Sequence, residues 1–330
     1  MRVSFPGLVD LQVNGFAGVD FNSPACAGEP MAQALAAMRA TGVTRCLPTI
    51  ITSSTPHFIS CARAILQRPH AGIAGLHMEG PYISPLDGPR GAHPREHVVP
   101  ASIDDFRRRQ DAAGGQIVLV TLAPEVPGAL ALIEYLVEQR ILVALGHTAA
   151  TAAQIADAVR ARARLSTHLG NGCAGQMHRH ENVLWPQLSA DELTASLIVD
   201  GHHLPREVVR SIVKAKGLAS VVLVTDAVTA AGAPAGRYQL GELEVERDAD
   251  GRVTQVGAGN LAGSALTLDD AIGRTARYCG LTLEQVLPMA STQPAALIGI
   301  QAAGRVEAEW DPVTHRLVVL QVSDNGSTRA

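Results

Sequence analysis

The side chains that could carry chemistry stand at the ends of short apolar segments. Glu79 closes "GLHME", and Asp226 follows "ASVVLVT". His147 and His168 follow "ILVALG" and "ARLST". Two neutral imidazoles and one carboxylate suit a hydrolytic metal site with one open position, where the metal acidifies water and polarises a carbonyl. We expect Glu79, His147 and His168 to bind the metal. We expect Asp226 to be the general base and acid.

Each of these residues alone has a plainer interpretation. A histidine at a strand end is usually a polar residue with its hydrogen bonds satisfied. Asp226 could be a helix N-cap or half of a buried ion pair. His93, in the loop motif "GAHP", could be a surface histidine rather than one that faces the site. Four such residues at four strand ends together favour a metal site over these alternatives.

The turn after Glu79 suggests how its carboxylate is aimed. Gly80 permits a sharp turn, and Pro81 fixes the direction in which the chain leaves. The Gly/Pro-rich loop that follows could fold over the site and bring His93 to it. His77 alternates with Glu79 and therefore shares its side of the strand, where we expect it to support the site or pack beneath it.

The elements that must position these residues alternate along the chain. Apolar segments predicted as strands are 7–13, 44–51, 72–78, 116–122, 141–146, 163–167, 194–200 and 219–225. Segments predicted as helices include 30–42, 56–67, 126–140, 151–163, 205–217, 267–280 and 282–291. Near-continuous apolar runs are typical of parallel strands buried on both faces. Eight alternations predict an α/β fold, a (β/α)8 TIM barrel with its active site at the carboxyl ends of the strands. An open doubly wound sheet is the alternative.

Two parts of the chain depart from this alternation. We expect residues 6–300 to form one barrel domain that carries a β-hairpin insertion at about 236–257, with its turn at Asp250-Gly251. Residues 304–322 predict a second hairpin. We expect 301–322, with the N-terminal residues, to form a small, reduced β-sandwich-like addition, and 323–330 to be a disordered tail.

Composition and charge exclude some classes of protein. The 330 residues are 47% hydrophobic, enough for a large core, and carry a net charge of −4. We expect no nucleic-acid or membrane partner, because the sequence shows neither a basic patch nor an apolar run of about 18 residues. The five cysteines are scattered without a CxxC pair, and the N-terminus does not read as a signal peptide. These features predict a cytoplasmic protein with reduced thiols.

A family resemblance covers about residues 6–300. The motifs that carry it are "PGLVDLQVNG", "GLHMEGPYISP", "GAHP", "LAPE", "LGHTAAT", "THLGN", "DGHHLP", "LVTDAV" and "LAGSALTLDDA". In this order they resemble the motifs of N-acetylglucosamine-6-phosphate deacetylases, metal-dependent barrels of the amidohydrolase superfamily. The resemblance implies amide hydrolysis on a phosphorylated amino sugar, and a homodimer whose neighbouring subunit helps to complete the phosphate pocket.

The resemblance also implies roles for single residues. Glu79, His147 and His168 match the family's metal ligands, and Asp226 matches its catalytic aspartate. The positions implied to contact the substrate are His93 near the scissile amide, Asn171, Gly172 and Arg179 at the phosphate, and His203. Gln12 and Asn14 stand where many amidohydrolases carry His-x-His. We expect them near the substrate, and they favour one metal over two, because amides are poor zinc ligands.

This chain departs from the family in one loop. The family's segment resembles "THLFNAMPPLHHREPG", whereas this chain reads "THLGNGCAGQMHRHENVLW". The loop at 172–186 therefore leaves the sugar assignment more open than the hydrolase assignment. Few residues precede the barrel here, where the family usually has strands of a β-sandwich.

Three functions follow from these observations. The first is a metal-dependent amide hydrolase that removes acetyl from N-acetylglucosamine 6-phosphate, with one divalent metal ion per chain. Zinc is the default metal, and Fe2+, Mn2+ or Co2+ are alternatives. The second is a deacylase of another N-acyl amino sugar or of an N-acyl amino acid. The third is a non-catalytic barrel that binds a sugar or a metal, which the presence of Asp226 disfavours because a binding module needs no general base.

Overall fold

Eight parallel strands form the central sheet of the computed structural model, which describes residues 1–324. Their order in the sheet is β11-β10-β9-β8-β7-β6-β5-β2. The strands are β2 (Leu8–Val13), β5 (Val43–Ile50), β6 (Leu76–Glu79), β7 (Ile117–Leu122), β8 (Leu142–Leu145), β9 (Leu165–Ser166), β10 (Thr194–Leu197) and β11 (Val221–Leu223). Each strand overlaps one of the predicted apolar segments, although β6 begins four residues later than predicted and β10 ends three residues earlier.

The first and last strands of this sheet meet and close it into a barrel. The N–H of Asp226 donates to the carbonyl of Gln12 at 2.9 Å, and the N–H of Asn14 donates to the carbonyl of Ala227 at 2.7 Å. The prediction of a (β/α)8 barrel is therefore confirmed, and the open doubly wound sheet is excluded. Because the strands are parallel, their carboxyl ends gather on one face of the barrel.

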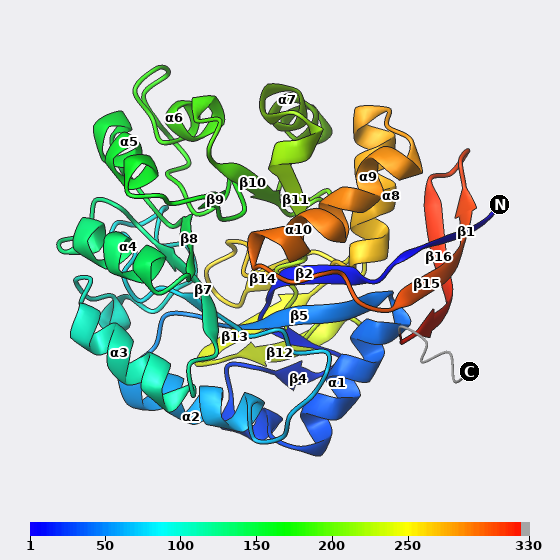
Figure 1. Cartoon of the computed structure of the whole chain (residues 1–330), viewed down its shortest axis with the longest axis horizontal. Helices are drawn as coiled ribbons and strands as arrows, with labels where there is room; N and C mark the ends of the chain where they lie inside the picture. Colours follow the sequence, from blue (N-terminus) through cyan, green and yellow to red (C-terminus); the bar gives the residue numbers. More distant parts are fainter. Residues whose placement is uncertain (325–330) are drawn as a thin grey trace.

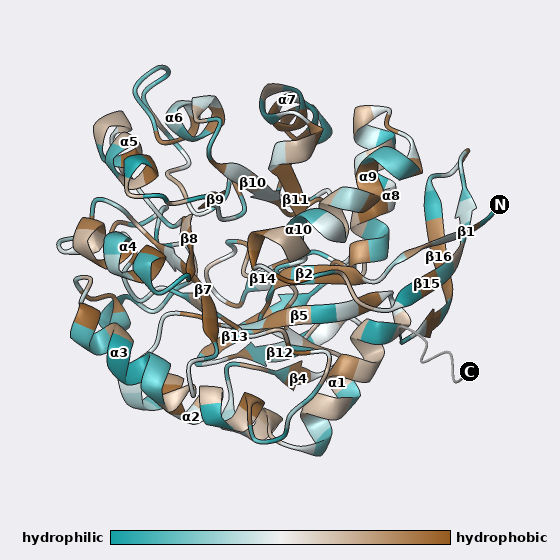
Figure 2. Cartoon of the chain, viewed as in Figure 1, coloured by the Kyte–Doolittle hydropathy of each residue, from teal (hydrophilic) through white to brown (hydrophobic). Residues whose placement is uncertain are grey.

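Helices surround the strands (Figure 1). They are α1 (Glu29–Ala40), α2 (Thr55–Ile65), α3 (Ile103–Ala112), α4 (Ala129–Glu138), α5 (Ala152–Arg160), α6 (Leu184–Ser189), α7 (Arg206–Lys216), α8 (Leu268–Cys279), α9 (Leu283–Ala290) and α10 (Thr292–Leu297). Every residue of β2, β6 and β11 is buried, as expected of strands that are covered on both faces. Figure 2 shows the difference in hydropathy between the barrel strands and some of the helices: β2 and β7 are mostly brown, or hydrophobic, and α3 is mostly teal, or hydrophilic.

Helix α3 shows why apolar spacing did not identify every helix. Its inward face carries Phe106 together with the buried pair Asp105 and Arg109, whose Oδ2 and Nε atoms are 2.9 Å apart. Since an ion pair replaces apolar residues on that face, the sequence lacks a helical apolar period there. Ser102 begins the helix by accepting a hydrogen bond from the N–H of Asp105.

The insertion was predicted as a two-stranded hairpin, and this is wrong in one respect, because it has three strands. These are β12 (Gly236–Leu240), β13 (Leu243–Arg247) and β14 (Val253–Gln255), in one antiparallel sheet. Asp250 and Gly251 do lie in the connection between β13 and β14, as predicted. A further tight turn at Gly241 and Glu242 separates β12 from β13, where the alternating sequence reads as one continuous strand.

The chain ends form a separate sheet in the order β1-β15-β16, with β1 (Arg2–Pro6), β15 (Arg305–Asp311) and β16 (Arg316–Ser323). The predicted C-terminal hairpin and its pairing with the N-terminal residues are confirmed, as one sheet. The predicted start of the disordered tail is wrong, because Ser323 belongs to β16 and Asp324 pairs with Arg39 at 2.9 Å. The rest of that tail, 325–330, lies outside the described residues. The boundary between barrel and addition stays a prediction.

Two short strands, β3 (Gly15–Phe16) and β4 (Val19–Asp20), pair beside the barrel, and three 3-10 turns complete the elements: η1 (Pro24–Cys26), η2 (Arg95–His97) and η3 (Leu218–Ser220). Among the helices of residues 1–324, none has the length and apolar character needed to cross a membrane.

Candidate active site

The four residues singled out at strand ends lie together at the carboxyl face of the barrel. Glu79 ends β6, His147 and His168 follow β8 and β9 by two residues, and Asp226 follows β11 by three; all four are buried. His147, His168 and Asp226 also account for three of the seven non-glycine residues with positive φ in the described chain, at 50°, 31° and 50°. Such backbone strain concentrates at functional sites, where the surrounding structure holds it in place.

The three predicted ligands converge as a metal site requires. The Oε1 atom of Glu79 lies 3.1 Å from Nε2 of His147 and 3.1 Å from Nε2 of His168. Metal bonds of about 2.0–2.1 Å in a tetrahedral site separate the ligand atoms by about 3.3 Å, so this spacing suits one ion. The described part of the chain therefore contains a buried Glu/His/His group that could hold a metal.

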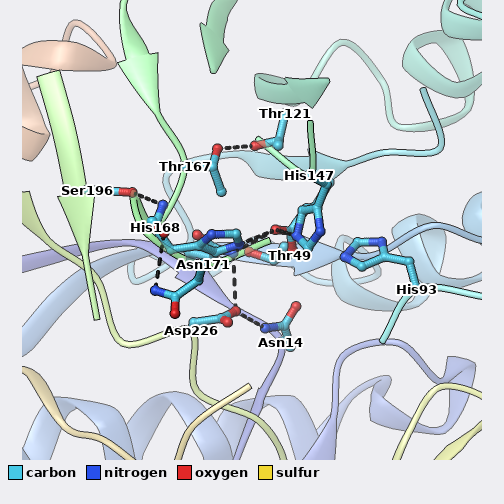
Figure 3. A network of polar contacts seen from close by, with 12 residues as sticks. Asn14, Thr49, His93, Thr121, His147, Thr167, His168, Asn171, Ser196 and Asp226 are labelled. Carbon is cyan, nitrogen blue, oxygen red and sulfur yellow. Dashed lines mark hydrogen bonds and ion pairs between the residues drawn. The ribbon is translucent and has the colours of Figure 1, made fainter. Parts of the chain in front are cut away.

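Neighbouring groups orient these ligands. The Nδ1 atom of His147 is 2.9 Å from the carbonyl oxygen of Pro89, so the ring donates there and Nε2 is the nitrogen that faces Glu79. The N–H of His168 donates to Oγ of Ser196 at 2.7 Å, which fixes the backbone after β9 (Figure 3). Nδ1 of His168 is buried and has no hydrogen-bond partner among the described residues.

The site is prepared for a cation. Burial alone would raise the pKa of Glu79, but hydrogen bonds from His147 and His168, together with the charge of His147, outweigh it and hold that pKa well below its usual value. Burial would lower the pKa of His147, but the neighbouring Glu79 raises it instead. The carboxylate of Glu79 is thus ionised in the buried site, and a cation is its natural partner.

Asp226 lies directly beside the ligand group. Burial and the charge of Glu79 raise the pKa of Asp226 to about 6. A carboxylate whose pKa lies near neutrality can both accept and return a proton, which is what a general base and acid must do. Its position after the last strand therefore matches the predicted role.

Gln12 and Asn14 contact the two carboxylates. The Nε2 atom of Gln12 donates to Oε1 of Glu79 at 2.9 Å and to Oδ1 of Asp226 at 3.1 Å. Nδ2 of Asn14 donates to the same Oδ1 at 2.6 Å (Figure 3). Asn14 lines the cavity above the site, whereas Gln12 is not among its lining residues. The structure thus makes Gln12 a positioning group for the carboxylates rather than a substrate contact.

His93 is brought to the site by the loop after β6, as expected. Its ring packs on that of His147 with centroids 4.2 Å apart (Figure 3). Its Nδ1 is 2.8 Å from Oγ1 of Thr52, and Arg90 donates to its carbonyl at 2.6 Å. Burial holds the pKa of His93 well below its usual value, so the ring is neutral. With Nδ1 held by Thr52, Nε2 is the nitrogen left for a substrate.

His203 also lines the cavity, and its orientation depends on Asp200, a carboxylate at a strand end to which the sequence assigned no role. Asp200 Oδ2 lies 2.7 Å from Nδ1 of His203, and Oδ1 accepts the N–H groups of His202 and His203 at 2.8 Å each. Burial would raise the pKa of Asp200, but these hydrogen bonds lower it to about 2. The motif "DGHH", with Asp three residues before His203, is the sequence signal that could have identified it.

His77 supports the site from beneath, in keeping with the prediction. Its Nε2 is 2.8 Å from Oγ1 of Thr121, which contacts Oγ1 of Thr167 at 2.7 Å, next to His168. Its Nδ1 is 3.3 Å from Oγ1 of Thr49. Burial lowers the pKa of His77 to about 4, so this network is neutral and binds neighbouring barrel strands together.

A cavity of about 450 Å3 opens above these groups. Asn171 and Gly172 line it, as predicted for substrate contacts, and Nδ2 of Asn171 donates to the carbonyl of His168 at 3.2 Å. Arg179 does not line it: the residue is exposed in the loop 172–186, where its carbonyl accepts from Nε1 of Trp185 at 2.9 Å. Among the described residues that line the cavity, none is Lys or Arg. Within one chain the structure therefore does not bring Arg179 to the cavity.

Comparison with known proteins identifies the family of this chain. The Amidohydrolase family model matches residues 3–313. The N-acetylglucosamine-6-phosphate deacetylase of Homo sapiens is 36% identical over 317 residues, which cover 91% of this chain and 75% of that protein. The N-acetylgalactosamine-6-phosphate deacetylase of Escherichia coli O157:H7 is 35% identical over 301 residues, covering 89% and 78%.

A solved structure agrees with these relatives. The N-acetyl-D-glucosamine-6-phosphate deacetylase of Mycobacterium smegmatis, in a mutant form in complex with N-acetyl-D-glucosamine-6-phosphate, superposes with a TM-score of 0.89 at 30% identity and covers 97% of this chain and 86% of that one. The chain therefore belongs to the amidohydrolase family, a metal-dependent family of hydrolases, and within it to the N-acetylglucosamine-6-phosphate deacetylases.

Proposed function

We propose that this protein removes acetyl from N-acetylglucosamine 6-phosphate, giving glucosamine 6-phosphate and acetate. The observation that carries the proposal is the buried Glu79, His147 and His168 group with Asp226 beside it, at the base of a cavity. The relatives and the solved structure with the phosphosugar bound support the choice of substrate.

We propose that Glu79, His147 and His168 hold one divalent ion per chain. When bound, the ion would acidify a water molecule and polarise the amide carbonyl. Zinc suits two imidazoles and a carboxylate, and Fe2+, Mn2+ or Co2+ would also suit them. A single ion is favoured because the Gln12 amide stands between Glu79 and Asp226, at 2.9 Å and 3.1 Å.

Each residue around the metal site then has its own role in the proposed reaction. Asp226 takes a proton from the attacking water as the C–O bond forms. The neutral ring of His93 donates a hydrogen bond from Nε2 to the carbonyl oxygen, where negative charge develops. The C–N bond then breaks as Asp226 delivers its proton to the amine nitrogen, so that protons balance. His203, held by Asp200, would contact the sugar.

A second candidate keeps this chemistry and changes the sugar. One relative of similar identity is named for N-acetylgalactosamine 6-phosphate, and the loop 172–186 of this chain departs from the usual family sequence. The two sugars differ only in the configuration at C4. We therefore propose N-acetylgalactosamine 6-phosphate as the alternative substrate, ahead of other N-acyl amino sugars and N-acyl amino acids.

One experiment tests both candidates. Acetate release would be measured from the two phosphosugars and from unphosphorylated N-acetylglucosamine, on protein whose bound metal has been quantified. We expect turnover of a phosphosugar with about one ion per chain. Equal turnover of the unphosphorylated sugar would show that phosphate is not recognised. No release from any of the three, with metal bound, would overturn the proposed function.

We further propose a cytoplasmic homodimer in which Arg179 reaches the phosphate site of the neighbouring subunit. The exposed position of Arg179 and the absence of Lys and Arg from the described cavity lining support this arrangement. Light scattering on the purified protein would give the mass of the assembly. An Arg179→Gln variant should raise KM for the phosphosugar and leave the metal content unchanged.

A further inference from the structure

Polar and apolar residues both line the cavity above the site. Asn171, Gly172 and His203 line it, and so do Met177, Leu184 and Ile198. Four further lining residues belong to one apolar cluster, which we call the apolar wall: Ile51, Ala92, Leu240 and Ala262. Asn171 and His203 can hydrogen-bond the hydroxyl groups of a sugar, whereas the apolar wall suits a small apolar group.

The apolar wall is part of a hydrophobic core of its own. Ile51, Leu240 and Ala262 are buried in a small cluster, separate from the main core, that also contains Val245 and Val253, and Ala92 packs against it. Leu240, the last residue of β12, has only 4% of its surface exposed. The three-stranded insertion therefore fixes the position of the wall, because its strands pack directly behind Leu240.

The wall also borders the reacting groups. Ile51 precedes Thr52, which holds Nδ1 of His93, and Ala92 precedes His93 itself. At the other end, Ala262 is two residues from Ser264, whose N–H donates to the carbonyl of Asp226 at 2.8 Å. The wall therefore spans the region between His93 and Asp226, where the scissile amide has to lie.

The chemistry of an amide decides which group meets the wall. The carbonyl carbon carries two substituents, the nitrogen that bears the sugar and the alkyl group of the acyl chain. If the sugar lies toward Asn171 and His203, the alkyl group points to the apolar wall. We propose that the apolar wall is the acyl subsite and that Leu240, supplied by the insertion, limits the acyl group to acetyl. This inference rests on the proposed function and deepens it.

The test compares acyl chains on one phosphosugar. Release of acetate, propionate and butyrate would be measured from the N-acyl derivatives of glucosamine 6-phosphate, with the metal-loaded protein and its Leu240→Ala variant. We expect the ratio of kcat/KM for butyryl over acetyl to rise by about tenfold or more in the variant, since each methylene in an apolar pocket is worth roughly that factor. A Leu240→Val variant, which disturbs packing less, should shift the ratio in the same direction.

Leu243→Ala is the matched control. Leu243 begins β13 in the same insertion but does not line the cavity, so the same truncation there should leave the ratio unchanged. An unchanged ratio in both Leu240 variants, with deacetylation retained, would overturn the acyl subsite and leave the proposed function intact. An equal shift in Leu243→Ala would overturn it too. No release of any acid by the unaltered protein would overturn both proposals.

Discussion

Two groups of three side chains in the described chain bring potential metal-ligand atoms within 4.8 Å of one another. The buried group is Glu79, His147 and His168. The surface group is Glu96, His97 and Glu242. Each has carboxylate and imidazole donors, so the types of donor do not distinguish them.

Their surroundings do distinguish them. In the buried group, Pro89 fixes the tautomer of His147, and Gln12 holds the shared carboxylate of Glu79. In the surface group, Nε2 of His97 lies 3.8 Å from Oε2 of Glu242, whose side chain is 59% exposed. Orientation by neighbouring groups and exclusion of water are what turn donors into a site. Burial and orientation, more than donor type, therefore identify the functional group.

The largest expected difference between the two groups concerns the metal itself. Glu79→Gln should lose both bound metal and acetate release. We expect the loss of activity to be at least about a hundredfold, because even partners outside the ligand set cost 10–100-fold. Glu242→Gln, the matched change in the surface group, should alter neither quantity. Metal analysis of the purified variants and acetate release measure both effects, and retention of metal by Glu79→Gln would contradict the assignment.

A large effect of a different kind is expected beside the buried group. Asp226→Asn should keep its metal but lose about 10²–10⁴-fold in kcat, the usual contribution of a general acid and base. The amide cannot accept a proton, yet its shape is nearly the same. Metal content measured beside kcat separates proton transfer from ligand binding. Activity close to that of the unaltered protein would show that another group moves the proton.

A smaller effect is expected at His203, which lines the cavity. Asp200→Asn should weaken the charge-assisted hydrogen bond that orients His203, and we expect kcat/KM to fall by about tenfold through a higher KM. Metal content should not change, since neither residue belongs to the buried group. Asp250→Asn, in an exposed turn of the insertion, is the control. A fall in kcat with KM unchanged would contradict a role in substrate binding.

The smallest expected effect is a shift in pH dependence. Asp226 must be ionised to accept a proton, so kcat/KM should fall as the pH drops through its pKa, about 6 without metal and lower with a cation beside it. The hydrogen bond from Asn14 stabilises the ionised form and lowers this pKa. Asn14→Ala should therefore raise the pKa and move the acid limb to higher pH, by roughly one unit. An acid limb that stays in place would show that Asp226 does not set it.

Much of the barrel and its ligand group could be predicted from local sequence. Each strand is a nearly continuous apolar segment because both of its faces are buried, and Glu79, His147, His168 and Asp226 follow such segments directly. A parallel barrel gathers the carboxyl ends of its strands at one face. Position along the chain therefore fixes position in space for these four residues, whatever the helices between them contain.

Other features depend on contacts between segments far apart in the sequence. On the inward face of helix α3 the Asp105–Arg109 ion pair takes the place of apolar residues, so no apolar period marks the helix. The exposed position of Arg179 depends on the path of a loop, which no periodic pattern specifies. Leu240 meets Ile51 only because the insertion folds back over the barrel. The barrel follows from local periodicity, and the residues that follow each strand can be read directly from the chain. Which loops line the cavity could be seen only in the folded protein, because it depends on packing between distant segments.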